Sequence, residues 1–246
     1  MKYILFLLVL VLTYQINAEE HPKLSNSILT IEYNNNMHSK ITANFPDSNP
    51  IMSKYYPSEQ LILAGKTITD FEMTDWKELN EADAKGLLLQ GKYSNGNIKI
   101  LKKISAKFIN DFPGFLITKA TYTNAGNDTL TVNGWINNNY NFIPAKDIVP
   151  PYWSYQGATY PDRRDWVQPV TKGFSQENYM GMNASDYGGG TPIVDLWRPD
   201  IGIAVGHLEN TPKLISLPVN FSSPEEGACL SVTYKFLEAV KLGPGE

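Results

Sequence analysis

The chain has 246 residues, with 21 Lys and Arg against 25 Asp and Glu, three His and one Cys. A formal net charge of -4 excludes the basic surface by which proteins bind nucleic acid or anionic lipid. A single cysteine excludes an internal disulfide bond and a cysteine-based zinc site, and the length suits one large domain or two small ones.

The N-terminal segment has the pattern of an export signal. Lys2 is followed by an unbroken apolar run, Ile4–Leu12, and then by the small residue Ala18. This order predicts a signal peptide over residues 1–18 that is cut after Ala18. The run is too short for a membrane span, which needs about 20 apolar residues. We therefore expect a secreted or periplasmic protein without a membrane span; an uncleaved anchor or a buried strand is the alternative.

The rest of the chain has the pattern of β-strands. Apolar residues alternate with period two most clearly over Cys229–Phe236, where Leu230 and Val232 point to one face and Cys229 and Ser231 to the other. The lone cysteine is therefore expected on a strand, not as a nucleophile. Thr, Tyr, Val and Ile dominate the other predicted strands, as is usual in sheets. These are Ile28–Tyr33, Gln60–Leu63, Lys66–Phe71, Asn97–Ile104, Phe115–Thr123, Thr129–Ile136, Ile193–Arg198, Ile201–His207 and Leu214–Val219.

Turn-forming residues separate these strands. Asn34–Asn36, Asn95-Gly96 and Asn124–Asp128 each read as a connection between two strands, the last two as hairpins. So many strands at short spacing predict an all-β fold, a large antiparallel β-sandwich.

One segment resembles a helix. It is Trp76–Lys85, which Asp75 could cap, with Glu78 at the capping-box position and Gly86 at the end. We therefore expect a single helix within an otherwise all-β chain.

The strand pattern fades between residues 137 and 190, where prolines and a glycine run interrupt the chain. A loop region of this size inside a compact domain is unusual and tends to be functional. It contains Tyr152–Tyr155 and Tyr160–Trp166, where aromatic residues lie beside polar ones as they do in carbohydrate sites. The alternative is that Trp153 and Trp166 only fix a long loop onto the sheets, since tryptophan is usually buried.

Two more segments carry polar residues beside aromatic or glycine residues. The first is 177–192, with three consecutive glycines that allow close approach of the backbone. The second is Asp195–Asp200 together with His207–Glu209, whose carboxylates could serve as acid and base. A glycosidase needs two carboxylates at a set separation, which sequence alone does not supply. The alternative is a structural turn in which Arg198 bonds loop carbonyls.

Metal and nucleophile chemistry lack support in the sequence. His21, His38 and His207 are scattered without ligand spacing, and no Gly-x-Ser-x-Gly motif occurs. We expect neither a metal site nor a cofactor.

The segment from Trp166 to Val219 resembles a known family. The matching motifs are Gly173–Gly190, Val194–Arg198, Ala204–His207 and Pro212–Val219. The block is similar to the N-terminal β-sandwich region of bacterial α-galactosidase-like (melibiase) glycoside hydrolases of clan D, closest to family 36. The resemblance implies a super-sandwich of the galactose-mutarotase-like type.

The resemblance also implies where the chemistry lies. Family members hydrolyse terminal α-linked galactose with retention, using two Asp residues on the strands of a central (β/α)8 barrel. This chain shows no alternating strand–helix pattern, so we expect no barrel and no catalytic residue in it. Long sandwich loops would instead complete the sugar subsite. On that basis the expected substrate-binding residues are Trp166, Asp186, Tyr187, Asp195 and Arg198.

We therefore expect residues 19–246 to form the non-catalytic N-terminal sandwich of an exported α-galactosidase-like enzyme. The ending Gly243–Glu246 reads as a turn toward a further strand, which suggests truncation before the barrel. The expected partners are an α-galactoside-type carbohydrate and the missing barrel, and a homo-oligomer is left open. The alternatives are a free-standing carbohydrate-binding module and a sugar epimerase that uses His207 with Glu209 or Glu177.

Overall fold

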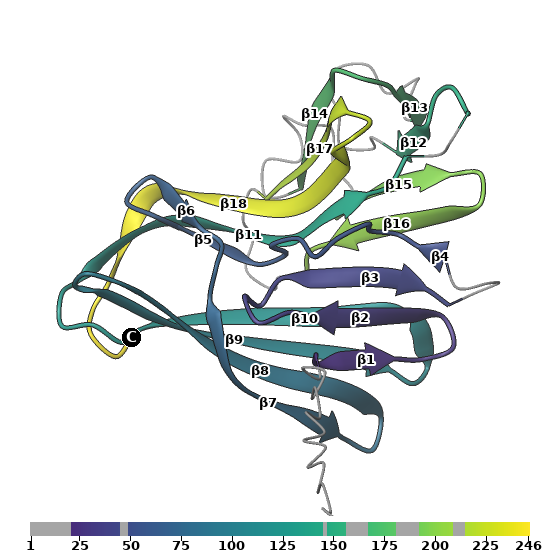
Figure 1. The fold of residues 1–246 in the computed structure, drawn as a ribbon. Coiled ribbons are helices and arrows are strands. Elements are labelled where there is room, and N and C mark those ends of the chain that lie inside the picture. The colour runs from purple at the N-terminus through teal and green to yellow at the C-terminus, as the bar shows by residue number, and fades with distance from the viewer. Residues whose placement is uncertain (1–20, 45–48, 145–146, 156–166, 181–191, 209–214) are drawn as a thin grey trace, which may run out of the picture.

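The computed structural model describes residues 21–44, 49–144, 147–155, 167–180, 192–208 and 215–246 (Figure 1). Within these ranges every regular element is a β-strand, so the all-β prediction is confirmed. The strands pair in antiparallel fashion and form four sheets. The predicted signal peptide, residues 1–18, lies outside the described residues.

The four sheets differ in their number of strands and in the parts of the sequence that supply them. Three of them contain four strands each, and the fourth contains six strands drawn from both halves of the sequence. The first sheet contains β1 (Lys23–Ser25), β2 (Leu29–Tyr33), β3 (Ser39–Ala43) and β4 (Asn49–Pro50), and the second contains β7 (Glu72–Asn80), β8 (Ala84–Asn95), β9 (Ile98–Ile109) and β10 (Phe112–Asn124). The six-stranded sheet has the order β14 (Phe174–Met180), β17 (Ile215–Ser223), β18 (Gly227–Leu242), β11 (Leu130–Phe142), β5 (Gln60–Leu63) and β6 (Lys66–Ile68). The last sheet has the order β13 (Val167–Val170), β12 (Tyr152–Tyr155), β15 (Ile193–Arg198) and β16 (Ile201–Gly206).

Most predicted strands and turns are confirmed. Strands β5 and β15 have the predicted bounds, and Cys229 lies on β18. The Asn95-Gly96 turn joins β8 to β9, with Gly96 at a φ of 58° that favours glycine. The loop after Asn124 joins β10 to β11, as expected for a hairpin.

The predicted helix over Trp76–Lys85 is wrong. The segment forms the end of β7, a turn and the start of β8, and Glu81 N–H donates to the Ala84 carbonyl at 2.9 Å within that turn. The half-buried residues of β7 (Met73, Trp76 and Leu79) lie three positions apart, which imitates a helical spacing. Pairing with the leucine-rich strand β8 decides the conformation, because tertiary contacts override weak local propensity.

The region from 137 to 190 contains more strand than predicted. Strand β11 continues to Phe142, and β12, β13 and β14 follow. Their signal is weak for physical reasons. Asn138 has a φ of 49° where the pairing with β18 shifts, and β13 carries Pro169 on an edge strand, where proline is tolerated.

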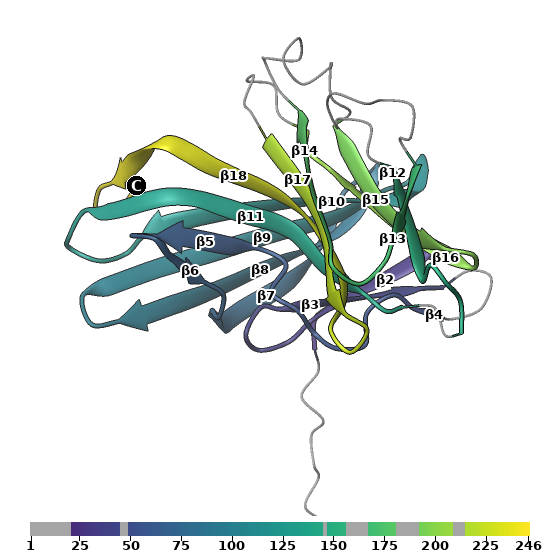
Figure 2. The same cartoon turned by 90° about the horizontal axis from the view of Figure 1, so that it is seen from above.

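The sheets enclose one continuous apolar core. Strands β11 and β18 run along one side of it and the β7–β10 sheet along the other, in both views (Figures 1 and 2). Strands β15 and β16 contact β17 and β18, so the sheet of β12, β13, β15 and β16 also faces the six-stranded sheet. Core residues such as Leu89, Ile104, Leu217 and Leu230 are at most 1% exposed. This packing holds the sheet of β12, β13, β15 and β16 in place and determines which of its faces is turned away from the core.

Candidate functional site

Two segments that are separate candidate site segments in the sequence are neighbours in the structure. Strands β12 and β15 are paired, and Trp153 lies directly opposite Trp197. The Tyr155 backbone N–H donates to Asp195 Oδ1 at 2.7 Å, and Ser154 Oγ donates to the Asp195 backbone carbonyl at 2.5 Å. The aromatic segment of residues 152–155 and the carboxylate of residue 195 therefore belong to one site.

Strand alternation sorts these residues onto two faces. Tyr152, Ser154 and Leu196 are buried against the core. Trp153, Tyr155, Asp195 and Trp197 are half-buried and point the opposite way. We refer to these last four residues as the outer aromatic face.

Small residues border the outer aromatic face on the side of β16. Gly202 pairs with Trp197, and Ala204 pairs with Asp195. A Cβ at Gly202 would lie 2.9 Å from Trp197 Cβ, so a side chain there would displace the tryptophan. On this side the neighbouring strand therefore offers no large side chain to cover the aromatic residues.

Tyr152 attaches β12 to the core from the opposite face. Its hydroxyl donates to the Phe142 carbonyl at 2.6 Å and accepts from the Ala228 N–H at 3.2 Å. Its ring centre lies 5.6 Å from that of Phe142 and 5.2 Å from that of Phe221. These contacts fix the strand that carries Trp153 and Tyr155.

Arg198, an expected substrate-binding residue, lies on the inner face and is 9% exposed. Its Nε and Nη2 donate to the two carboxylate oxygens of Asp200 at 2.8 and 3.0 Å, and its Nη1 donates to the Ile143 carbonyl at 2.9 Å. Its guanidinium also lies 5.3 Å from the centre of the Phe142 ring. This is the structural arrangement weighed for Arg198: it connects the β15–β16 turn to the end of β11.

Asp195 is the expected site residue that the structure places on the outer aromatic face. Burial raises the pKa of its carboxyl, and the hydrogen bond from Tyr155 N–H opposes part of this rise. A half-buried carboxyl beside aromatic rings can accept hydrogen bonds from ligand hydroxyls.

Trp166, Asp186 and Tyr187 lie outside the described residues. The strand ends next to their segments are described. Tyr155 pairs with Val167 at the end of the β12–β13 pair. Ile193 and Met180 begin β15 and end β14, and each is paired with a neighbouring strand.

Asp195 is a site residue expected from the sequence, whereas the other three members of the outer aromatic face are not among the expected site residues. Trp153, Tyr155 and Trp197 were noted only within their segments. The signal that could have found them is the spacing of aromatic residues two apart on β12, together with a tryptophan on another short strand. Which strand lies beside β12 is not encoded locally.

Two of the residues considered for an epimerase, His207 and Glu177, lie in the described part of the chain. The His207 ring centre lies 5.3 Å from that of Trp135. Glu177 is exposed on β14, opposite Pro218 of β17, and Glu209 lies outside the described residues. His38 lies between β2 and β3, and its Nε2 is 3.2 Å from Asp70 Oδ1.

Two further observations concern metals and membranes. Over the described ranges, no group of three or more His, Cys, Asp or Glu residues is close enough to hold a metal ion. The same part of the chain contains no helix of sufficient length and apolar character to span a bilayer.

Comparison with known proteins shows a likeness among solved structures. No family model matches the chain, and no curated protein matches it. Among solved structures, the α-galactosidase from Lactobacillus brevis is similar, with 12% sequence identity and a TM-score of 0.60. The likeness covers 92% of this chain and 37% of that chain. At this identity it shows that the fold is related to part of an α-galactosidase.

Proposed function

We propose that this chain is a carbohydrate-binding β-sandwich domain of an exported glycoside hydrolase related to α-galactosidases. The fold relationship supports the glycosidase context. The two facing layers, β11 and β18 on one side and β7–β10 on the other, support the sandwich assignment. The observation that carries the binding role is the outer aromatic face, where Trp153 and Trp197 are opposite each other beside Asp195.

The chemistry of this face suits a sugar. Indole and phenol rings stack on the C–H faces of pyranose rings, and a carboxylate accepts hydrogen bonds from the hydroxyls. Trp153, Tyr155 and Trp197 supply the rings, and Asp195 supplies the carboxylate. We propose an α-galactoside-type ligand, with Trp166, Asp186 and Tyr187 completing the subsite from the segments next to these strands. In this scheme Arg198 supports the subsite through its contacts with Asp200 and the Ile143 carbonyl.

The binding role predicts a loss of affinity on truncation of the aromatic face. We expect Trp197→Ala to weaken binding of an α-galactoside such as raffinose by about tenfold or more, which corresponds to about 1.4 kcal/mol. The reason is loss of a stacking surface beside Asp195. Isothermal titration calorimetry on the full chain measures the affinity.

Trp76→Ala is the matched control, because Trp76 is also half-buried on a strand but lies on β7 in another sheet. Its affinity should equal that of the wild type. Equal losses in both variants would show a general effect of removing tryptophan, and unchanged affinity in Trp197→Ala would contradict the proposed site.

The chain is proposed to be non-catalytic, with the acid/base and nucleophilic carboxylates in another domain of the enzyme. We expect no turnover of p-nitrophenyl α-galactoside by the 246-residue chain, because a glycosidase needs two carboxylates and the outer aromatic face carries one, Asp195. Release of p-nitrophenol measures the activity. Robust hydrolysis that persists through repeated purification would overturn the non-catalytic assignment and leave the binding test unaffected.

A further inference from the structure

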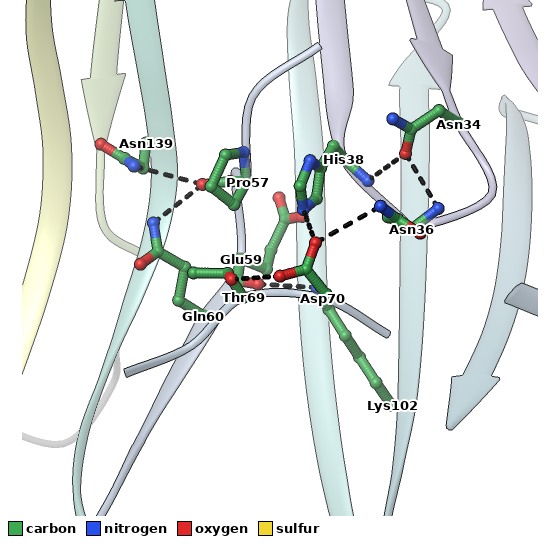
Figure 3. A network of polar contacts seen from close by, with 10 residues as sticks. All are labelled: Asn34, Asn36, His38, Pro57, Glu59, Gln60, Thr69, Asp70, Lys102 and Asn139. Carbon is green, nitrogen blue, oxygen red and sulfur yellow. Dashed lines mark hydrogen bonds and ion pairs between the residues drawn. The ribbon is translucent and has the colours of Figure 1, made fainter. Parts of the chain in front are cut away.

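A buried charged cluster lies where three of the four sheets meet (Figure 3). Glu59 directly precedes β5 and is 0% exposed, and Lys102 on β9 is 1% exposed. Lys102 Nζ donates to the backbone carbonyl of Glu59 at 2.6 Å and lies 4.8 Å from the centre of the Phe71 ring. Lys and Glu are almost never fully buried unless they are paired, so the cluster is an unusual feature of this core.

The segment that carries Glu59 is held from two sides. Ser39 at the start of β3 and Tyr56 exchange two backbone hydrogen bonds, of 3.0 and 2.8 Å. On the other side, the Asn139 N–H of β11 donates to the Ser58 carbonyl at 3.0 Å. A movement of Glu59 therefore displaces strands in two sheets, and its contact with Lys102 adds a third.

The surroundings of the Glu59 carboxyl fit its neutral form better than its ionised form. Ser58 Oγ donates to Oε2 at 2.6 Å, whereas Oε1 has no hydrogen-bond partner among the described residues. An ionised carboxylate offers about four acceptor positions, so one donor leaves it poorly solvated. The hydroxyls of Tyr33 and Tyr122 are likewise buried without a partner in the described part of the chain.

We propose that Glu59 is a proton-operated lock at this junction: its carboxyl takes up one proton from solvent as the pH falls, which tightens the contact among the three sheets, and returns it as the pH rises, which loosens it. Burial raises the pKa of Glu59, and attraction to Lys102 and the bond from Ser58 offset only part of that rise. A folded-state pKa above the unfolded value means that the folded chain binds more protons in the interval between them. Stability from this group therefore increases as the pH falls through that interval.

Other titratable groups face the same cluster and must be separated from Glu59. Burial lowers the pKa of Lys102 to about 8, and burial also lowers that of His38. His38 acts in the opposite direction, because its folded form resists protonation and loses stability as the pH falls. Asp70 lies near both cations, and Tyr140 contributes a buried hydroxyl.

The decisive comparison is between wild type and Glu59→Gln, because glutamine keeps the neutral shape at every pH and both proteins retain His38 and Lys102. Urea unfolding of the full chain at about pH 5 and about pH 7.5 gives the ratio of their unfolding constants. We expect the unfolding constant of the wild type, divided by that of Glu59→Gln, to be several-fold larger at about pH 7.5 than at about pH 5. The exposed Glu78→Gln on β7 is the control, and its ratio to wild type should stay constant.

An unchanged ratio for Glu59→Gln would overturn the lock. If the variant does not fold, ¹³C NMR titration of the Glu59 carboxyl in the wild type replaces the comparison. A midpoint above the ordinary range of glutamate is expected, and a midpoint within or below it would overturn the proposal.

Discussion

Lys102→Met is expected to destabilise the fold by about 3–5 kcal/mol at pH 7, because it leaves the buried Glu59 carboxylate without the nearby positive charge. The substitution removes the donor to the Glu59 carbonyl and the positive charge that lowers the pKa of Glu59. The Glu59 carboxylate then remains in the core with Ser58 as its donor. Urea unfolding monitored by circular dichroism measures the loss.

The pH dependence of this variant has a definite sign. Without Lys102, the pKa of Glu59 rises further above its unfolded value, and the folded variant takes up a proton more readily than the unfolded chain. The destabilisation is therefore largest near neutral pH and shrinks as the pH falls. The opposite trend would contradict the assignment of the cost to Glu59.

Two variants complete this test. Lys107→Met removes a lysine from the same strand whose partner, Glu81, is at the surface, and should cost no more than about 1 kcal/mol. The double variant Glu59→Gln/Lys102→Met removes both charges and should recover most of the stability that the single lysine variant loses. A double variant as unstable as Lys102→Met would show that packing of the lysine stem, not charge, accounts for the effect.

Tyr152→Ala is expected to cost about 3–5 kcal/mol, as is usual when a fully buried aromatic residue is truncated. The ring fills the contact between β12 and the six-stranded sheet, against Phe142 and Phe221. Sugar binding should fall as well, because Trp153 and Tyr155 lie on the same strand. Denaturant unfolding and calorimetric titration measure the two effects.

Tyr152→Phe separates the hydroxyl from the ring. It leaves the Phe142 carbonyl and the Ala228 N–H without this shared partner and should cost about 1–3 kcal/mol. Tyr93→Phe, at a half-buried tyrosine of β8, is the control and should change stability by less than about 0.5 kcal/mol. If both phenylalanine variants are equally stable, the buried hydroxyl of Tyr152 contributes nothing specific.

The differences between the expected and the observed elements have identifiable physical causes. The segment Trp76–Lys85 imitates a helix because the half-buried residues of β7 lie three positions apart, whereas pairing of β7 with β8 makes it a hairpin. The expected loop region contains β13 and β14, which are edge strands with prolines or polar residues and so lack apolar alternation. An edge strand pairs with a neighbouring strand on one side only, and without apolar alternation it is hard to recognise in the sequence.

The sequence by itself determined the all-β class, most strand positions, the hairpin turns and the place of Cys229 on a strand. These properties follow from side chains that alternate between two faces and from turn residues whose conformational preferences act locally. Only the tertiary structure decided that Trp153 lies opposite Trp197, that Arg198 faces inward, and that Lys102 reaches the carbonyl of Glu59. Each of these depends on which distant strands become neighbours, and that choice is made by packing a shared core rather than by any local pattern.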